Sequence, residues 1–165
     1  MPDHLRSTYS IKDIAHVFGS EDGFLLQNGA ITGSVNGGYI RTVVLPKSSD
    51  TPTVQFKAFL HGIIETVDMK VDIISMHSTV GQNLDLDLEY TVVGSGDNFD
   101  TKAQEAVLNE TPTTPDVAFD RFVVSFTIPQ ENISEDSALE MRLTRNVGAE
   151  TGDYEIWGVI IYQVI

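Results

Sequence analysis

The sequence predicts an all-β fold, an antiparallel β-sandwich of the jelly-roll type, with a short helix or arm at the N-terminus. Three observations predict it. Apolar and polar residues alternate with a period of two in several segments, turn residues recur between those segments, and strands do not alternate with helices. A parallel α/β sheet is therefore disfavoured, and two packed antiparallel sheets fit the pattern best.

Composition indicates one soluble domain, which we place at 24–165 after an N-terminal arm or short helix at 1–23. A chain of 165 residues can bury a sizeable core, and 41% hydrophobic and 21% charged residues are typical of globular proteins. The formal net charge is −14, which argues against nucleic acid and anionic membranes as partners, because both are bound through Lys and Arg. The absence of cysteine excludes disulfides and thiolate metal sites. No signal peptide or membrane-length apolar run is present, so we expect synthesis in a cytoplasm.

The arm contains a candidate helix. Ser10 suits an N-cap, Ile11, Ile14 and Phe18 fall on one helical face, and Gly19 suits the end of the helix. An extended segment is the open alternative.

The first part of the domain predicts short strands joined by tight turns. Residues 24–27 are apolar, Asn28-Gly29 is a hairpin signal, and 31–35 is the expected return strand. A second turn at 36–38 leads into a strand at 39–45.

Three strongly patterned strands follow, at 54–60, 67–74 and 84–92. In each, every second residue is apolar, so that one face of the strand is expected in the core. The pattern is most regular at 84–92. Its polar face carries Asp85, Asp87, Glu89 and Thr91.

The C-terminal stretch predicts two further strands, after one at 122–128 that ends at Pro129. Residues 139–144 alternate in polarity, whereas 154–165 is apolar on both faces. A strand that is apolar on both faces is covered on both, either by another chain or as a central strand within its own domain. If another chain covers it, the candidate oligomer interface is the face that carries Trp157, Val159 and Ile161.

This stretch also carries a resemblance to a known family. The pattern comprises Leu139, Met141, Arg142, Leu143 and Arg145, then Gly152-Asp153, then Gly158-Val159-x-Ile161-Tyr162. It resembles the end of a β-sandwich module common in bacteriophage virion proteins, and the likeness extends in outline over 53–165. The resemblance implies a strand within 101–110, where the residues themselves are ambiguous between helix and strand.

The function that the resemblance implies is that of a phage virion structural protein, a capsid decoration (cement) protein that stabilises the head. Its expected partners are itself, as a homotrimer, and the major capsid protein or another virion protein, and its expected location is the virion. By the same analogy the N-terminal arm docks on the particle. The candidate docking residues are Leu5, Tyr9, Ile11, Ile14 and Phe18.

A carbohydrate- or receptor-binding module of a tail fibre or tail spike is the alternative. Sugar-binding sandwiches present flat aromatic side chains beside polar ones. The candidates for such platforms are Trp157, Tyr9, Tyr39 and Phe99. A tryptophan within a strand is more often a core or interface residue than a platform.

Catalytic motifs are absent from the sequence. There is no Gly-x-Ser-x-Gly elbow, no cysteine nucleophile and no glycine-rich phosphate loop with a lysine. The four histidines lack the spacing of a zinc site. We therefore expect no enzyme activity, no cofactor and no metal.

Two acidic groups are candidate calcium ligands. Asp85, Asp87 and Glu89 lie on one strand face, where solvation or pairing with Arg142 or Arg145 is the simpler expectation. The second group lies on a glycine-rich loop but follows no calcium motif. It consists of Asp97, Asn98 and Asp100.

Overall fold

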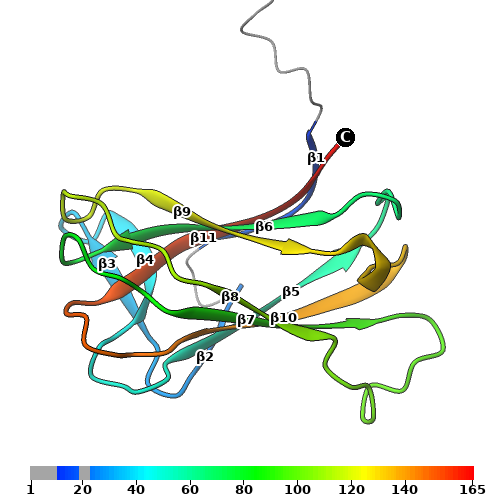
Figure 1. Ribbon diagram of the computed structural model, residues 1–165, viewed down its shortest axis with the longest axis horizontal. Helices are drawn as coiled ribbons and strands as arrows, with labels where there is room; N and C mark the ends of the chain where they lie inside the picture. The colour runs from blue at the N-terminus through cyan, green and yellow to red at the C-terminus, as the bar shows by residue number, and fades with distance from the viewer. Residues whose placement is uncertain (1–10, 19–22) are drawn as a thin grey trace, which may run out of the picture.

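The structure is a computed structural model, and it describes the backbone of residues 11–18 and all atoms of 23–165. These residues form two β-sheets packed face to face (Figure 1). The strands are β1 (Ile11–Phe18), β2 (Leu25–Gln27), β3 (Ile31–Val35), β4 (Ile40–Leu45), β5 (Thr53–Leu60), β6 (Met69–His77), β7 (Leu86–Val93), β8 (Ala106–Glu110), β9 (Phe122–Ile128), β10 (Ser137–Arg145) and β11 (Tyr154–Val164). One turn of 3₁₀ helix, η2 (Gln130–Asn132), separates β9 from β10.

The strand order is that of a jelly roll. Sheet A has the order β3-β4-β11-β6-β9, with β1 also paired to β11, and sheet B has the order β2-β5-β10-β7-β8. From β4 onward the chain crosses between the sheets at every step except β7 to β8, and all pairs are antiparallel. The predicted antiparallel β-sandwich is confirmed.

The core lies between the sheets and is built by the predicted alternation. Val54, Phe56, Ala58 and Leu60 of β5 are buried, as are Leu86 and Leu88 of β7, while the residues that alternate with them face outward. The period of two thus places each strand's apolar set against the other sheet.

Strand β11 is a central strand with a bulge. It lies between β6 on one side and β4 and β1 on the other, so its own domain covers it. Its register against β6 shifts between Ile156 and Gly158, which leaves Trp157 as the extra residue. The bulge reverses the alternation, so Val159 and Ile161 point into the core and are completely buried.

The three residues of the predicted oligomer interface therefore do not form one exposed patch, and this prediction is wrong. Of its three residues, Val159 and Ile161 fill the core, and Trp157 is exposed at 38%. Alternation along a regular strand cannot reveal a bulge, and this is why the sequence assigned Val159 and Ile161 to the outer face.

Of the two interpretations of the N-terminal segment, the helix is wrong and the extended alternative is confirmed for 11–18. Residues 11–18 form strand β1, which pairs with Gly158–Val164 of β11. Strand β4 pairs with β11 only through Ile156, so the rest of that edge has backbone groups that need partners, and β1 supplies them. Of the predicted docking residues, Leu5 and Tyr9 lie outside the described residues, and the structure gives only the backbone of Ile11, Ile14 and Phe18.

The turn at Asn28-Gly29 forms, but the hairpin does not. Both residues have positive φ, 53° and 91°, and the amide of Ala30 donates to the carbonyl of Gln27 at 3.0 Å. The strands on either side belong to different sheets, because β2 pairs with β5 and β3 pairs with β4. A turn signal specifies local backbone geometry, whereas the burial of each strand decides its partner.

The ambiguous segment 101–110 contains strand β8 in its second half, Ala106–Glu110, at the edge of sheet B. The described part of the chain contains no helix long and apolar enough to cross a membrane.

Candidate functional site

The outer face of sheet B places a row of polar side chains across three strands. Arg142 of β10 lies opposite Gln55 of β5 on one side and opposite Glu89 of β7 on the other. These residues face outward because they alternate with buried ones such as Met141 and Leu143. The row is therefore a direct product of strand periodicity and register.

Arg142 is held from both sides. With the amide of Gln55 turned so that its oxygen faces the guanidinium, Oε1 accepts from Nη2 and Nε of Arg142 at 3.0 and 3.1 Å. Nη1 lies 3.7 Å from Oε2 of Glu89, and the Arg142 side chain remains 47% exposed. Its neighbours orient the guanidinium, and its exposed face is free to donate hydrogen bonds to a ligand.

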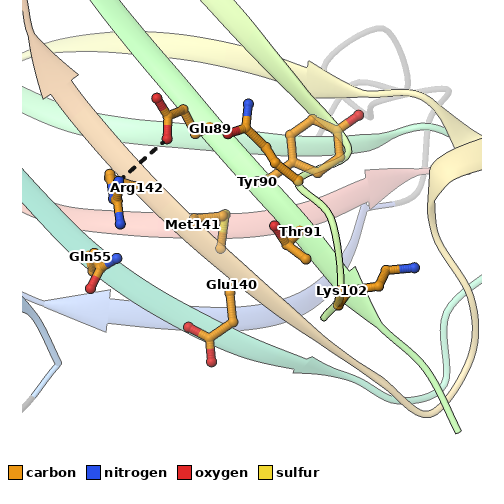
Figure 2. A pocket seen from close by; sticks show the side chains of 9 residues that line it. Gln55, Glu89, Tyr90, Thr91, Lys102, Glu140, Met141 and Arg142 are labelled. Atoms are coloured by element: carbon orange, nitrogen blue, oxygen red, sulfur yellow. Dashed lines mark ion pairs between the residues drawn. The ribbon is translucent and has the colours of Figure 1, made fainter. Parts of the chain in front are cut away.

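A second row and a loop enclose this residue. Glu140 of β10 lies opposite Lys57 and Thr91, and Figure 2 shows it beside the same hollow as Arg142. The hollow has a volume of about 270 Å³, and Lys102 and Gln104 of the β7–β8 loop also line it.

Two further hollows adjoin the first. One, of about 340 Å³, extends toward β2 and shares Gln55 and Glu140 with it. The other, of about 160 Å³, extends toward the β9–β10 loop and shares Lys102. The first two hollows lie on the outer face of sheet B and form the open groove that we call the sheet B groove, and the third adjoins it at the end of the sandwich.

Lys102 is fixed at the wall of this groove by two carboxylates. Its Nζ lies 3.2 Å from Oε1 of Glu105 and 3.3 Å from Oδ2 of Asp97. The hydrogen bonds from Lys102 to Glu105 and then to Asp97 raise the pKa of Lys102 above its ordinary value. The amide of Gly94 donates to Asp97, and this bond lowers the pKa of that carboxyl. The loop therefore presents a wall in which one ammonium group lies between two carboxylates.

Phe59 supplies an aromatic side chain near the groove, and sequence reasoning missed it. It lies on the outer face of β5, two residues beyond Lys57, and is 61% exposed. Its strand neighbour is Ala138, which in turn lies opposite Val93. The alternation of β5 could have predicted its exposure, because Phe59 lies on the same face as the polar residues of the strand, and the opposite face is entirely apolar.

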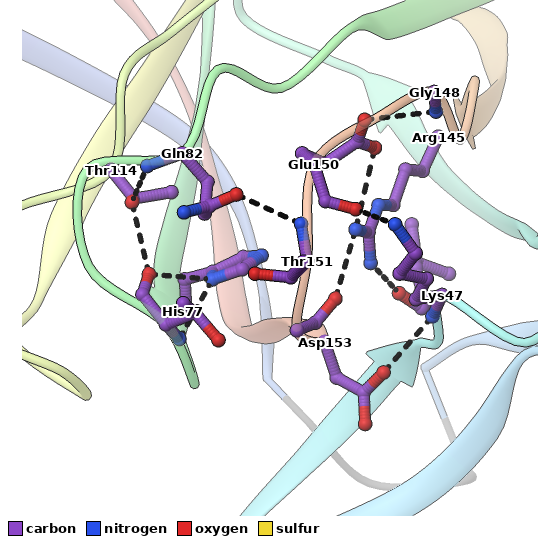
Figure 3. A network of polar contacts seen from close by, with 12 residues as sticks. Lys47, His77, Gln82, Thr114, Arg145, Gly148, Glu150, Thr151 and Asp153 are labelled. Atoms are coloured by element: carbon purple, nitrogen blue, oxygen red, sulfur yellow. Dashed lines mark hydrogen bonds and ion pairs between the residues drawn. The ribbon is translucent and has the colours of Figure 1, made fainter.

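A second polar network lies inside the sandwich, around Arg145 (Figure 3). This side chain is completely buried and lies 3.4 Å from Glu150. Its Nη1 donates to the carbonyl of Leu45 at 2.7 Å, and its Nη2 donates to the carbonyl of Gly152 at 2.9 Å. Burial lowers the pKa of Arg145, against the opposing effect of Glu150. The amide of Lys47 donates to Oδ1 of Asp153 at 2.9 Å.

This network is a scaffold for the β10–β11 loop. Buried carbonyl groups need donors, and one guanidinium serves two of them from different segments. Close packing continues at Gly152, with φ +84°, where a Cβ would lie 2.2 Å from Oγ1 of Thr79. The predicted pairing of the acidic strand face with Arg145 is wrong, because this arginine faces the core, whereas Arg142 does pair with Glu89.

Asp85 and Asp87, and a cluster of one histidine with two carboxylates, have local partners. Nδ2 of Asn109 donates to Asp85 and Asp87 at 2.6 and 2.7 Å, so an amide joins these two carboxylates. Among the described residues, His61, Glu135 and Asp136 bring three ligand atoms within 4.8 Å of one another.

These three groups are bound to neighbouring protein atoms. His61 Nδ1 lies 2.8 Å from Asp136, and Glu135 accepts from the amides of Gly62 and Ile63. Both carboxylates therefore serve local structure at the start of β10.

The aromatic platforms that the sequence suggested do not gather in one place. Tyr39 is 89% exposed beside the β3–β4 turn, Phe99 is 76% exposed on the β7–β8 loop, and Trp157 lies on sheet A. Tyr9 lies outside the described residues.

Comparison with known proteins gives similarity in fold. No family model and no curated protein matches the chain. The CBM22-1 xylan-binding domain of Paenibacillus barcinonensis Xyn10C superposes with a TM-score of 0.51 and 9% identity, over 92% of this chain and 95% of that one. The conserved carbohydrate esterase of the Shiga toxin-encoding bacteriophage phi24B gives 0.51 and 12%, over 93% and 99%.

A third similar structure is larger than this protein. The CBM22-1–GH10 modules of the Clostridium thermocellum endo-1,4-β-D-xylanase 10B, in complex with xylohexaose, give a TM-score of 0.50 and 18% identity over 94% of this chain. This chain spans 28% of that one. At these identities the likeness establishes the sandwich fold.

Proposed function

We propose that this protein is a non-catalytic module that binds a carbohydrate chain in the sheet B groove. The observation that carries the proposal is Arg142, an exposed guanidinium oriented by Gln55 and Glu89 at the centre of the groove. Planar guanidinium, amide and carboxylate groups in fixed positions match pairs of neighbouring sugar hydroxyls, which both donate and accept hydrogen bonds.

The surroundings of Arg142 support a sugar ligand. Glu140 and Thr91 add acceptors and a hydroxyl, and Phe59 offers an apolar ring that can stack on a sugar ring near the end of the face. Two of the similar folds are described as xylan-binding or as complexed with xylohexaose, which agrees with this use of the sandwich.

Binding without catalysis is the simpler chemistry for the groove. Glu89 lies 3.7 Å from the guanidinium of Arg142, so this carboxylate orients the arginine. Glycoside hydrolysis needs a pair of carboxyl groups that act on the same bond, whereas the role of Glu89 here is a positional one.

The test is affinity electrophoresis and calorimetry against a panel of soluble polysaccharides, comparing the wild type with Arg142→Ala. We expect Arg142→Ala to weaken binding by roughly tenfold or more, because a charge-assisted hydrogen bond contributes about 1.5–3 kcal/mol. The matched control is Arg41→Ala, an exposed arginine near the start of β4 in the other sheet, which should bind as the wild type does. Equal loss in both variants, or no binding to any member of the panel, would overturn the proposal.

A second candidate is the virion structural role, as a capsid decoration protein that forms a trimer. The observation that favours it is Trp157, which a bulge presents on the outer face of a central strand at 38% exposure. Co-sedimentation with capsids and a trimeric mass in solution would support this role, and Trp157→Asp should then release monomers.

A further inference from the structure

Strand β9 is an edge strand with an unpaired side. Among the residues that the structure describes, β9 pairs with β6 through Met69–Ser75, and no other hydrogen bond reaches the backbone of Phe122–Ile128. Strand β8 contacts part of β9 but pairs with β7 in the other sheet, so the outer N–H and C=O groups of β9 have no strand partner among the described residues.

The strand has none of the features that usually protect a sheet edge. Short length, charged residues, proline and bulges are the common protections. β9 has seven residues, carries no charge and no proline, and keeps a continuous register with β6. Of the other edge strands, β2 has three residues, β3 and β8 have five each, and β1, with eight, contains the charged residues Lys12 and Asp13.

The lack of charge is notable in a chain with 24 acidic residues. Every other described strand of six residues or more contains at least one charged residue. Val123 is 45% exposed on β9, and the next outward residue, Ser125, is neutral and also exposed. An uncharged strip on a surface of net charge −14 is the region where two copies approach with least repulsion.

We infer that β9 pairs antiparallel with β9 of a second copy, forming a two-fold dimer with sheet A continuous across both. The flanking residues favour this occupant. Arg121 precedes the strand and Glu131 follows it, and both are exposed. Antiparallel pairing places Arg121 of each copy near the segment around Glu131 of the other, so the interface is self-complementary.

This surface has a defined symmetry. Two antiparallel copies of one strand are related by a two-fold axis, and both outer edges are satisfied once they pair. The homotrimer would need a different surface. A strand pair of this length makes a small interface, so the dimer is expected to dissociate measurably on dilution.

Sedimentation equilibrium of the full chain, from micromolar to millimolar concentration, tests the inference. We expect a monomer–dimer equilibrium in the wild type, and a dimer weakened by about tenfold or more in Val123→Lys, because a charge at the edge must be desolvated on pairing. The matched control is Ile31→Lys on β3, the opposite edge of the same sheet, where the side chain is 53% exposed. It should dimerise as the wild type does.

Circular dichroism and melting temperature confirm that both variants are folded, which is expected because both side chains are exposed in the wild type. Three results would overturn the inference: a monomeric wild type over the whole range, a Val123→Lys dimer as tight as the wild type, or a trimeric mass. Binding of an unrelated extended peptide by a monomeric wild type would also overturn it.

Discussion

Glu155 places a carboxylate on the outer face of sheet A with only 6% of the residue exposed. Oγ1 of Thr42 donates to its Oε1 at 2.7 Å, and Gly33 makes room beside it, since a Cβ there would lie 2.4 Å from Val44 and 3.4 Å from Glu155. Burial raises the pKa of Glu155 above its ordinary value, the bond from Thr42 opposes this, and the charge of Asp153 adds to it.

The pH dependence follows from the direction of that shift. Because the folded-state pKa of Glu155 lies above the unfolded value of 4.5, the folded protein holds a proton that the unfolded chain releases between the two values. Lowering the pH through this window adds stability from Glu155, and above the window its buried charge costs stability. We expect Glu155→Gln to melt higher than the wild type at pH 7 and to lose this gain on acidification.

Thermal melts of the wild type and Glu155→Gln between pH 7 and 4.5 give the comparison. Burial lowers the pKa of His77, so this residue destabilises the fold as the pH falls below 6.5. Its contribution is the same in both proteins and cancels in the difference between their melting temperatures. Glu140→Gln, at an exposed position, is the control and should follow the wild type. A uniform loss of stability in Glu155→Gln at all pH values would mean that the ionised carboxylate stabilises the fold.

At the scale of the element, β11 determines how sheet A is assembled. Its first three residues pair with β4, the bulge at Trp157 follows, and Gly158–Val164 pairs with β1. The change of neighbour coincides with the bulge, which bends a strand and increases its twist. One inserted residue thus lets β11 serve two partners on one side while both halves keep their apolar set in the core.

Deleting Trp157 should be tolerated far better than deleting Ile160. Without Trp157, Gly158 still lies opposite Ile74 and Val159 opposite Ile73, so the alternation becomes regular and the buried side chains stay in the core. Deleting Ile160 removes a residue that the register needs, so Val159 or Ile161 has to turn to the outer face, and a buried aliphatic side chain contributes about 1.5–3 kcal/mol. We expect the Trp157 deletion to keep the β-sheet spectrum in circular dichroism and the Ile160 deletion to melt at a much lower temperature. Equal melting temperatures of the two deletion variants would show that Trp157 is not the extra residue.

At the scale of the whole molecule, acidic residues outnumber basic ones, 24 to 10. Even where Lys57, Lys102 and Arg142 gather, in or beside the sheet B groove, the carboxylates of Glu89 and Glu140 line the same surface. The surface as a whole is therefore strongly acidic. Net charge this far from zero destabilises a compact state through self-repulsion.

Added salt should stabilise the protein. At physiological ionic strength charges are screened beyond about 8 Å, so long-range repulsion weakens while the buried contacts of Arg145 persist. We expect the melting temperature to rise between low salt and about 0.5 M NaCl, and KCl to give the same curve. A fall would show that surface ion pairs outweigh the repulsion.

Calcium chloride at matched ionic strength is the control for a specific ion. It should act as NaCl does, and a larger effect would assign a cation site to one of the acidic groups, such as that of His61, Glu135 and Asp136.

The class of fold and most strand positions follow from the sequence because they depend on local patterns. Alternation at Leu84–Val92 and 54–60 specifies which face is buried, and the turn residues at 36–38 mark a true hairpin. The exposed aromatic Phe59 was also readable from its phase on the strand. Each of these signals lies within a few residues of the feature that it predicts.

Other features depend on which segments meet, and only the tertiary structure decided them. Residues 11–18 became a strand because part of the β11 edge needed a partner, and Val159 turned inward because of a single inserted residue. The sheet B groove likewise required three strands separated in sequence to align Gln55, Arg142 and Glu89. Long-range pairing carries no local signature in the chain, because any strand edge offers the same backbone hydrogen bonds, and the burial of the whole sandwich selects among them.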